Sequence, residues 1–296
     1  MDAPGFLGLS ARDFDRAPAV AVLPIPLELT VTFGGGTARG PAAILEASQQ
    51  VELYDRELGR EPVLDYGVAT LAPLATTADP ATAVDEIARA VAERTAAGAF
   101  VLSLGGEHTL TVGAVRGVLR ARPGGLTVVQ IDAHADLRAR YAGSAYNHAC
   151  VARRLLEESR VDQILQLGIR SVATEEAELI AAEPERLRVW WAEEIHAGGW
   201  VAELEERLSG RDVYLSIDVD GLDPALVPAT GTPEPGGLDW SQALAMTRAI
   251  SRAAMVVGMD CVELAPSPGL HHADFAVAKL LYKTLSFIHC PPGGTA

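Results

Sequence analysis

The chain has 296 residues, 49% of them hydrophobic, and a formal net charge of −15 from 39 acidic and 24 basic side chains. That hydrophobic content is ample for one sizeable core, whereas the acidic balance makes nucleic acid and anionic membranes poor partners. The cysteines Cys150, Cys261 and Cys290 form no C-x-x-C pair, which argues against a disulfide framework or a structural zinc knuckle. Without a signal-peptide pattern or an apolar run of about 18 residues, the sequence predicts a cytoplasmic protein that does not enter the membrane.

Short apolar runs rich in β-branched residues alternate along the chain with longer, alanine-rich segments of helical period. Buried strands are expected at Val20–Pro24, Phe100–Leu104, Leu126–Ile131, Gln163–Leu167, Val213–Ile217 and Met255–Met259. Helices are expected at Asp79–Ala97, with Asp79 as the N-cap, at Val201–Leu208 and at Ser241–Ala253. Nearly continuous apolar strands that alternate with helices predict an α/β fold with an open, mostly parallel sheet, in one domain over residues 1–296.

Two loops rich in glycine and proline, Gly34–Pro41 and Pro228–Gly237, lie between structured segments and are expected to be ordered. The first loop suggests phosphate binding, but it matches neither the G-x-G-x-x-G nor the Walker pattern. A turn after which Pro41 starts a helix is the better explanation. The last six residues, Pro291–Ala296, are expected to fray.

Metal-ligand side chains follow three of the predicted strands, and the carboxyl ends of parallel strands meet at one edge of a sheet. Two imidazoles and four carboxylates should therefore converge there: His108, Asp132, His134, Asp136, Asp218 and Asp220. Four carboxylates so close together could not all stay ionised without a compensating cation. Nitrogen and oxygen ligands without thiolate favour Mn²⁺, with zinc, nickel and iron as alternatives. Two such ions about 3.5 Å apart, bridged by Asp132 and Asp218, could share one water and convert it to hydroxide near neutral pH.

Each cluster also has an interpretation without a metal. Asp-x-His-x-Asp can be three solvated side chains on one side of an extended chain, and the glycines before His108 can form a tight turn. The segment from Asp218 to Ala229 fails as a calcium loop, because Asp223 stands where glycine is needed and Ala229 where glutamate is needed. Metal-ligand residues after three separate strands favour a metal site over three independent coincidences.

With these motifs, the chain resembles the ureohydrolase (arginase/agmatinase) family over nearly its whole length, from about residue 18 to about residue 288. The matching blocks occur in the order that the family has: Gly105–Thr109, Asp132–Asp136, Ser216–Pro224, Thr230–Leu238 and Asp260–Glu263. The resemblance implies a three-layer α/β/α sandwich, two Mn²⁺ ions per subunit and a homo-oligomer, either a trimer or a hexamer.

The resemblance also implies roles for single residues. One metal ion would be held by His108, Asp132, Asp136 and Asp218, and the other by His134, Asp132, Asp218 and Asp220. His148 would lie near the substrate and relay protons, Glu263 would pair with the guanidinium, and Thr232 would supply a hydroxyl near that carboxylate. Asp136, His148 and Glu263 are the implied catalytic residues. The histidines outside the motifs are expected to be structural or exposed: His196, His271, His272 and His289.

The segment Asp136–Arg154 resembles the agmatinase branch of the family, with Asp-Leu-Arg, a Tyr-x-Gly turn, and His-Ala-Cys followed by Arg-Arg. It lacks the Ser-Gly-Asn-x-His-Gly stretch of arginase-like chains. The resemblance therefore implies hydrolysis of agmatine, a small cationic guanidino compound, to putrescine and urea. Three positions depart from the common pattern: Glu107 replaces aspartate, Asn147 replaces serine, and Ala265 replaces asparagine or serine.

Other substrates remain alternatives, namely guanidinobutyrate, guanidine, arginine and formiminoglutamate. A substrate that carries a carboxylate would need a cation at the mouth of the pocket, which Arg138 or Arg140 could supply. A binding or scaffold protein without catalysis is a further alternative. It is disfavoured because all six candidate ligands, His148 and Glu263 are present.

Overall fold

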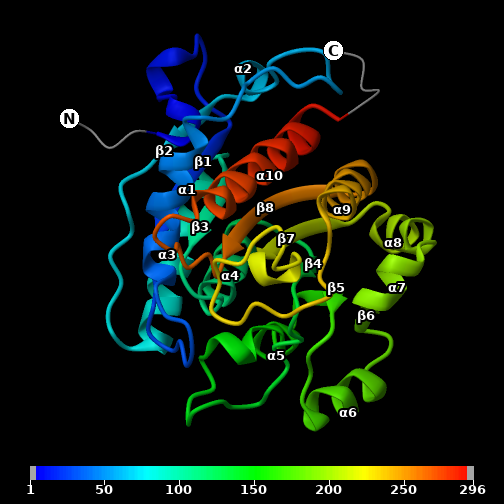
Figure 1. Cartoon of the computed structure of the whole chain (residues 1–296). Helices are drawn as coiled ribbons and strands as arrows, with labels where there is room; N and C mark the ends of the chain where they lie inside the picture. Colours follow the sequence, from blue (N-terminus) through cyan, green and yellow to red (C-terminus); the bar gives the residue numbers. More distant parts are fainter. Residues whose placement is uncertain (1–4, 292–296) are drawn as a thin grey trace.

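The central sheet of this protein consists of eight strands in the order β2-β1-β3-β8-β7-β4-β5-β6 (Figure 1). The computed structural model describes residues 5–291. Every pair of neighbouring strands in the sheet is parallel. The strands are β1 (Val20–Ile25), β2 (Val68–Thr70), β3 (Phe100–Gly105), β4 (Leu126–Ile131), β5 (Val161–Ile169), β6 (Leu187–Trp191), β7 (Asp212–Asp218) and β8 (Met255–Val262). The predicted α/β fold with an open, parallel sheet is therefore confirmed.

All six predicted strands form, and each one keeps or extends its expected bounds. The two strands that the pattern did not predict, β2 and β6, are the edges of the sheet. Edge strands are covered less completely than central ones, so their apolar runs are shorter or interrupted. Two of the three residues of β2 are only half-buried, and the half-buried Arg188 interrupts β6.

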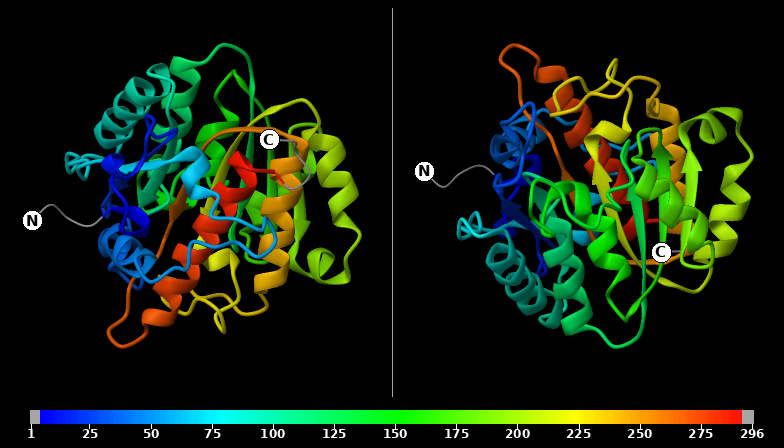
Figure 2. Two further views of the ribbon diagram at one scale, coloured as in Figure 1. Left: turned by 90° about the horizontal axis from the view of Figure 1, so that it is seen from above. Right: turned by 90° about the horizontal axis from the view of Figure 1, so that it is seen from below.

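Helices cover both faces of the sheet and complete three layers, as Figure 2 shows from two sides. One face packs through the larger of two buried apolar clusters against α1 (Gly40–Ser48), α7 (Ala192–Ala197), α8 (Trp200–Leu208), α9 (Trp240–Ala253) and α10 (His271–His289). The other face packs through the second cluster against α3 (Pro80–Ala96), α4 (Leu110–Ala121), α5 (Val151–Leu156) and α6 (Thr174–Ala182). Short helices lie in the connections, namely α2 (Val63–Tyr66) and the 3₁₀ helices Phe6–Gly8, Ala11–Asp13, Thr37–Arg39, His148–Cys150 and Val219–Gly221.

The three predicted helices form as α3, α8 and α9, each within one residue of its expected bounds. Asp79 caps α3 as expected, because its side chain accepts a hydrogen bond from the N–H of Thr82 at 2.9 Å. Pro41 lies in the first turn of α1, so the glycine-rich loop leads into a helix as predicted. The predicted frayed tail at 291–296 lies, beyond its first residue, outside the described residues. Within residues 5–291, no helix combines the length and the apolar character needed to span a bilayer.

The strand order determines where a ligand can bind. β3, β8, β7 and β4 are neighbours at the centre of the sheet, although the chain forms β3 and β4 early and β7 and β8 late. Where the strand order reverses in this way, the loops diverge and leave a crevice beyond the carboxyl ends of the strands. Side chains that follow these four strands can therefore meet: His108 and Glu263, which are 155 positions apart in the sequence, share a hydrogen bond.

A glycine is required where the loop after β1 passes the end of β3. A Cβ atom on Gly106 would lie 1.9 Å from the carbonyl oxygen of Leu27. Backbone hydrogen bonds hold the two segments together, since the N–H of Gly106 donates to the carbonyl of Ile25 at 3.0 Å and the N–H of Glu107 donates to that of Leu27 at 2.8 Å. This contact places the loop after β1 beside the carboxyl end of β3.

A buried ion pair joins α10 to the loop before α2. The Nζ atom of Lys283 donates to Oδ2 of Asp55 at 2.7 Å and lies 3.3 Å from Oε2 of Glu57. Burial alone would raise the pKa of Asp55, but Lys283 and the N–H groups of the loop hold this pKa below its usual value. Asp55 is only 3% exposed, so loss of the cation would leave a carboxylate without its partner inside the protein.

We expect Lys283→Met to lower the free energy of unfolding by about 3 kcal/mol at pH 7, because it leaves a buried charge uncompensated. The lowered pKa of Asp55 stabilises the folded state at pH values above the unfolded-state pKa of about 3.9. This contribution is lost as the pH falls through the folded-state pKa. The difference between variant and wild type should therefore shrink below about pH 4, which denaturant unfolding at several pH values would measure. Lys279→Met is the matched control, since Lys279 donates to the backbone carbonyl of Glu52; equal losses in both variants would contradict the prediction.

Candidate metal centre

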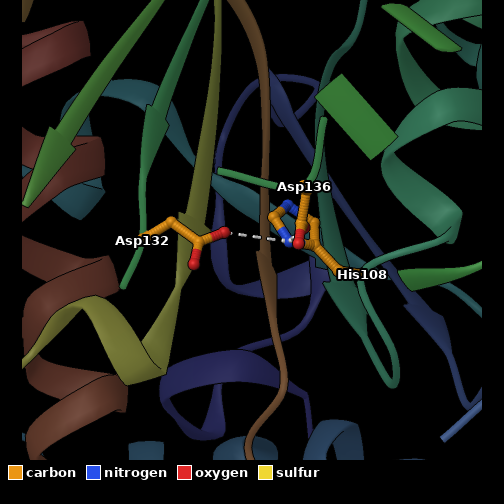
Figure 3. Close-up of side chains that lie close together, drawn as sticks. All are labelled: His108, Asp132 and Asp136. Carbon is orange, nitrogen blue, oxygen red and sulfur yellow. Dashed lines mark ion pairs between the residues drawn. The ribbon is translucent and has the colours of Figure 1, made fainter. Parts of the chain in front are cut away.

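Two groups of imidazole and carboxylate side chains lie at the carboxyl ends of the central strands. Ligand atoms of His108, Asp132 and Asp136 lie within 4.8 Å of one another, and so do those of Asp132, His134 and Asp220. Figure 3 shows His108, Asp132 and Asp136 pointing toward one another. Asp132 belongs to both groups, so one carboxylate links two potential ion sites.

The Nδ1 atom of His108 faces three carboxylates. The nearest oxygens lie at 3.2 Å for Asp132, 3.0 Å for Asp136 and 3.2 Å for Asp218. Even so, Nδ1 is buried and has no hydrogen-bond partner of acceptable geometry among the described residues. An unsatisfied buried nitrogen surrounded by carboxylate oxygens is the arrangement that a cation between these atoms would stabilise.

The other ring nitrogen of His108 determines which atom carries the proton. Nε2 lies 3.0 Å from Oγ of Ser216, and that hydroxyl donates its only proton to Asp260 at 2.7 Å. Nε2 must therefore be the donor to Ser216, and in the neutral ring Nδ1 presents a lone pair to the carboxylates. The residues therefore fit a divalent ion, which would accept the lone pair and neutralise the acidic oxygens.

The second group surrounds His134, whose Nδ1 lies 3.0 Å from Oδ2 of Asp220 and 3.7 Å from Oδ1 of Asp132. Asp132 thus turns Oδ1 toward His134 and Oδ2 toward His108. Asp218 turns Oδ2 toward the first group, while its Oδ1 accepts the N–H of Asp220 at 2.9 Å. All six predicted ligand residues therefore meet, with Asp132 between the two groups and Asp218 beside His108.

The charges in the site affect one another strongly. Burial, together with the charge of Asp132, raises the pKa of Asp136 to about 7. Burial and neighbouring aspartates also raise the pKa values of Asp218 and Asp220. Although burial opposes a charged imidazole, Asp132 and Asp220 raise the pKa of His134 to about 12. Without a metal the site therefore retains protons that a divalent ion would displace, as in other ligand sets for metals.

A row of buried polar side chains crosses five strands close to their carboxyl ends. In the register of the sheet, the members of this row pair in the order Ser103, Asp260, Ser216, Gln130 and Gln166, and none is more than 1% exposed. Gln166 donates to Oε1 of Gln130 at 3.0 Å, and Gln130 donates to Oδ2 of Asp132 at 2.7 Å. The row, which lies within the sheet just before the strand ends, thus orients ligands of the candidate centre. Sequence reasoning missed it, although the polar residues within or directly after the apolar runs were the available signal.

Two candidate residues have left-handed backbone conformations, with φ of 53° at Asp136 and 65° at Glu263. Such conformations cost about 1–3 kcal/mol each in non-glycine residues and cluster at functional sites. Hydrogen bonds hold Glu263 in place, since its N–H donates to Gly106 at 2.8 Å and its Oε1 accepts the N–H of His108 at 2.6 Å. Burial raises the pKa of Glu263 to about 8. A cationic partner would favour its ionised form.

Arg170, which the motifs did not indicate, holds the turn after β7. Its guanidinium donates to backbone carbonyls of two loops, including those of Asp220 at 2.6 Å and Glu234 at 2.9 Å. On the other side, Gly221 packs so closely against β4 that a Cβ atom there would lie 2.8 Å from the nitrogen of Asp132. The backbone that presents Asp220 is therefore fixed from both sides.

The candidate centre lines a cavity of about 260 Å³. The predicted substrate residues His148, Thr232 and Glu263 line the same cavity. Its remaining wall comes from Arg138 and Tyr141 of the segment Asp136–Arg154, and from residues that the motifs did not indicate, including Val31–Phe33, Ser171, Val172 and Glu176. The histidines expected to be structural or exposed, His196, His271, His272 and His289, do not line it.

One of the three departures from the family pattern, Asn147, has a local explanation. Asn147 caps the short helix that begins at His148, because its Oδ1 accepts the N–H of Ala149 at 3.0 Å. Asparagine and serine are both good N-caps, so the substitution keeps this contact. Ala265 is 7% exposed and donates through its backbone to Ala229 at 2.8 Å. Neither Asn147 nor Ala265 lines the cavity.

Comparison with known proteins gives a consistent result. The model of the arginase family matches residues 18–286. Two curated relatives are named N(1)-aminopropylagmatine ureohydrolase: that of Synechocystis sp. is 43% identical over 91% of this chain and 89% of its own, and that of Thermus thermophilus is 38% identical over 90% and 89%. The solved structure of agmatine ureohydrolase from Thermoplasma volcanium is 33% identical, covers 92% of this chain and 90% of its own, and has a TM-score of 0.81.

Removing divalent ions with a chelator should make the stability depend on pH. In the metal-free protein, Asp136, with a pKa raised to about 7, and Asp218 and Asp220, with raised pKa values, retain protons that the unfolded chain releases near pH 3.9. Their contribution to stability is full below that value and is lost as the pH rises through the folded-state pKa values. We therefore expect the melting temperature of chelated protein to fall from pH 5 to pH 8, and Mn²⁺ to restore it most at pH 8. A melting temperature indifferent to chelator at pH 8 would exclude a stabilising metal site.

Proposed function

This chain belongs to the arginase family and is a ureohydrolase, and we propose that it acts on guanidino amines, with N(1)-aminopropylagmatine preferred over agmatine. Hydrolysis would release urea and leave a primary amine, which is a triamine for the longer substrate and putrescine for agmatine. The observation that carries the proposal is the pair of imidazole and carboxylate groups that share Asp132 beside a cavity lined by Glu263 and His148.

We assign the metal ligands as the family resemblance implies. His108, Asp132, Asp136 and Asp218 would hold one ion, and His134, Asp132, Asp218 and Asp220 the other. Two Mn²⁺ ions in these positions would activate water for attack on the guanidinium carbon. The lone pair of His108 Nδ1 among three carboxylates supports this assignment.

The other residues of the cavity would bind and orient the substrate. A guanidinium next to Glu263 can donate two parallel hydrogen bonds to the carboxylate, and its charge would offset the burial that raises the pKa of Glu263. Thr232 would supply a hydroxyl beside it. His148 would transfer a proton to the departing amine, since an amine leaves readily only when it is protonated.

Features of the cavity wall fit a substrate with a polymethylene tail. Val31, Val172 and the 73% exposed Phe33 offer apolar surface for a polymethylene chain. Relatives that are 38–43% identical carry the name of the aminopropyl substrate, which supports the longer diamine tail over agmatine.

A urea-release assay on Mn²⁺-loaded protein tests this function. We expect kcat/KM to be highest for N(1)-aminopropylagmatine, lower by about tenfold for agmatine, and lower still for guanidinobutyrate, arginine and guanidine, because each lost contact of the tail weakens transition-state binding. Formamide release from formiminoglutamate covers the remaining alternative. If the loaded protein released urea from none of these compounds, the proposed function would be wrong.

Replacing the shared carboxylate should affect both ions. We expect Asp132→Ala to reduce the bound metal to well below one ion per chain and to lower urea release by at least about a hundredfold, since loss of a ligand typically removes metal and activity together. The control is Asp212→Ala. Asp212 lies at the start of β7, away from the site, and pairs with Arg122 at 3.0 Å, so this variant should retain both the bound metal and urea release. Metal analysis after desalting gives the comparison. Unchanged metal content in Asp132→Ala would favour the alternative of a scaffold protein.

A further inference from the structure

We propose that Glu107 and Thr30 are positioning residues that set the orientation and the proton position of His148. The inference rests on the proposed function, because it explains how His148 would present one defined ring nitrogen to the substrate. Glu107 is one of the three departures from the family pattern, and it is not a candidate metal ligand. It is fully buried and does not line the cavity.

Glu107 holds the loop after β1 through three hydrogen bonds. Its Oε2 accepts the N–H groups of Leu29 and Thr30, each at 2.6 Å, and its Oε1 accepts the hydroxyl of Thr30 at 2.8 Å. All three partners are donors, and this is the arrangement that an ionised carboxylate requires. The next residues of that loop, Val31–Phe33, line the cavity.

Thr30 connects this carboxylate to His148. Its Oγ1 accepts the backbone N–H of His148 at 3.1 Å and lies 3.2 Å from Nδ1 of the same residue. A contact to the hydroxyl of Thr109 is longer, at 3.4 Å. Because a charged acceptor forms the stronger bond, the Thr30 proton points to Glu107.

The direction of these bonds fixes the tautomer. A threonine hydroxyl has one proton and two lone pairs. With the proton used on Glu107, Thr30 can only accept from His148, so Nδ1 must carry the ring proton. Nε2 is then the nitrogen that is free to exchange a proton with the substrate. The Tyr141 ring, whose centroid lies 5.9 Å from that of His148 in an edge-on contact, limits rotation of the imidazole.

Replacing Glu107 with glutamine should reverse this chain of hydrogen bonds. The amide oxygen can still accept the N–H groups of Leu29 and Thr30, which leaves the amide N–H₂ facing the hydroxyl. Thr30 would then accept from the amide and donate to Nδ1, so the ring proton would move to Nε2. The variant thus changes the tautomer and leaves the shape of the loop in place.

The tautomer can be observed directly. We expect ¹⁵N spectra of histidine-labelled, zinc-loaded protein, with the His148 signals assigned by their loss in His148→Ala, to show the proton on Nδ1 in the wild type and on Nε2 in Glu107→Gln. A wild-type His148 with its neutral proton on Nε2 would overturn the proposal. The NMR measurement of the tautomer does not require turnover. Absence of urea release would therefore count against the proposed function alone.

Kinetics with matched variants separate positioning from loop structure. Thr30→Val should lower kcat about tenfold with KM little changed, a part of the roughly 10²- to 10⁴-fold that a general acid or base contributes, and Thr30→Ser should retain the wild-type rate. In a His148→Ala background, Thr30→Val should have no further effect, because coupled residues are not additive. Hydrogen exchange at residues 28–33 should be unchanged in Thr30→Val, which keeps the hydrogen bonds from the backbone N–H groups of Leu29 and residue 30 to Glu107. A full tenfold loss in the His148→Ala background would overturn the proposal.

Discussion

Repulsion among four buried aspartates is the constraint on which the rest of the site depends. Asp132, Asp136, Asp218 and Asp220 are each at most 6% exposed, and they lie against two imidazoles. Hydrogen bonds from backbone N–H groups stabilise part of the negative charge. The N–H of His134 donates to Asp132 at 2.6 Å, and that of Ala133 donates to Asp220 at 3.1 Å. These bonds orient single oxygens and leave the others facing Nδ1 of the histidines. Only protons or cations can stabilise what remains.

The parallel sheet supplies the rigidity that such an arrangement needs. Four adjacent strands end at the site, and each carries its functional residues at or within a few positions of that end. The polar row beneath them costs apolar packing, but hydrogen bonds join Gln166 to Gln130, Gln130 to Asp132, and Ser216 to Asp260 and His108. Hydrogen bonds between buried side chains of this kind favour one geometry. The strained backbone at Asp136 and Glu263 is tolerated because the neighbouring strands hold it.

Substrate choice depends on loops that the sheet does not specify. The loop after β1 supplies one wall of the cavity, and the segment from Arg138 to His148 supplies another. Glu107 ties the first wall to the backbone beside His108, and Thr30 joins it to His148. The same reaction can therefore be directed to different guanidino compounds by changes in a few loop residues, as is common where function is carried by loops on a shared fold.

The sequence by itself determined the central strands, the parallel α/β fold and all six candidate ligands, because apolar runs and the residues directly after them are local patterns. It left out the edge strands β2 and β6, whose runs are short or interrupted. Only the tertiary structure decided that Gln130 and Arg170 support the site, and that Thr30 contacts His148 from 118 positions away. Hydrogen bonds between residues so far apart depend on strand order and loop path, and neither leaves a periodic signal in the chain.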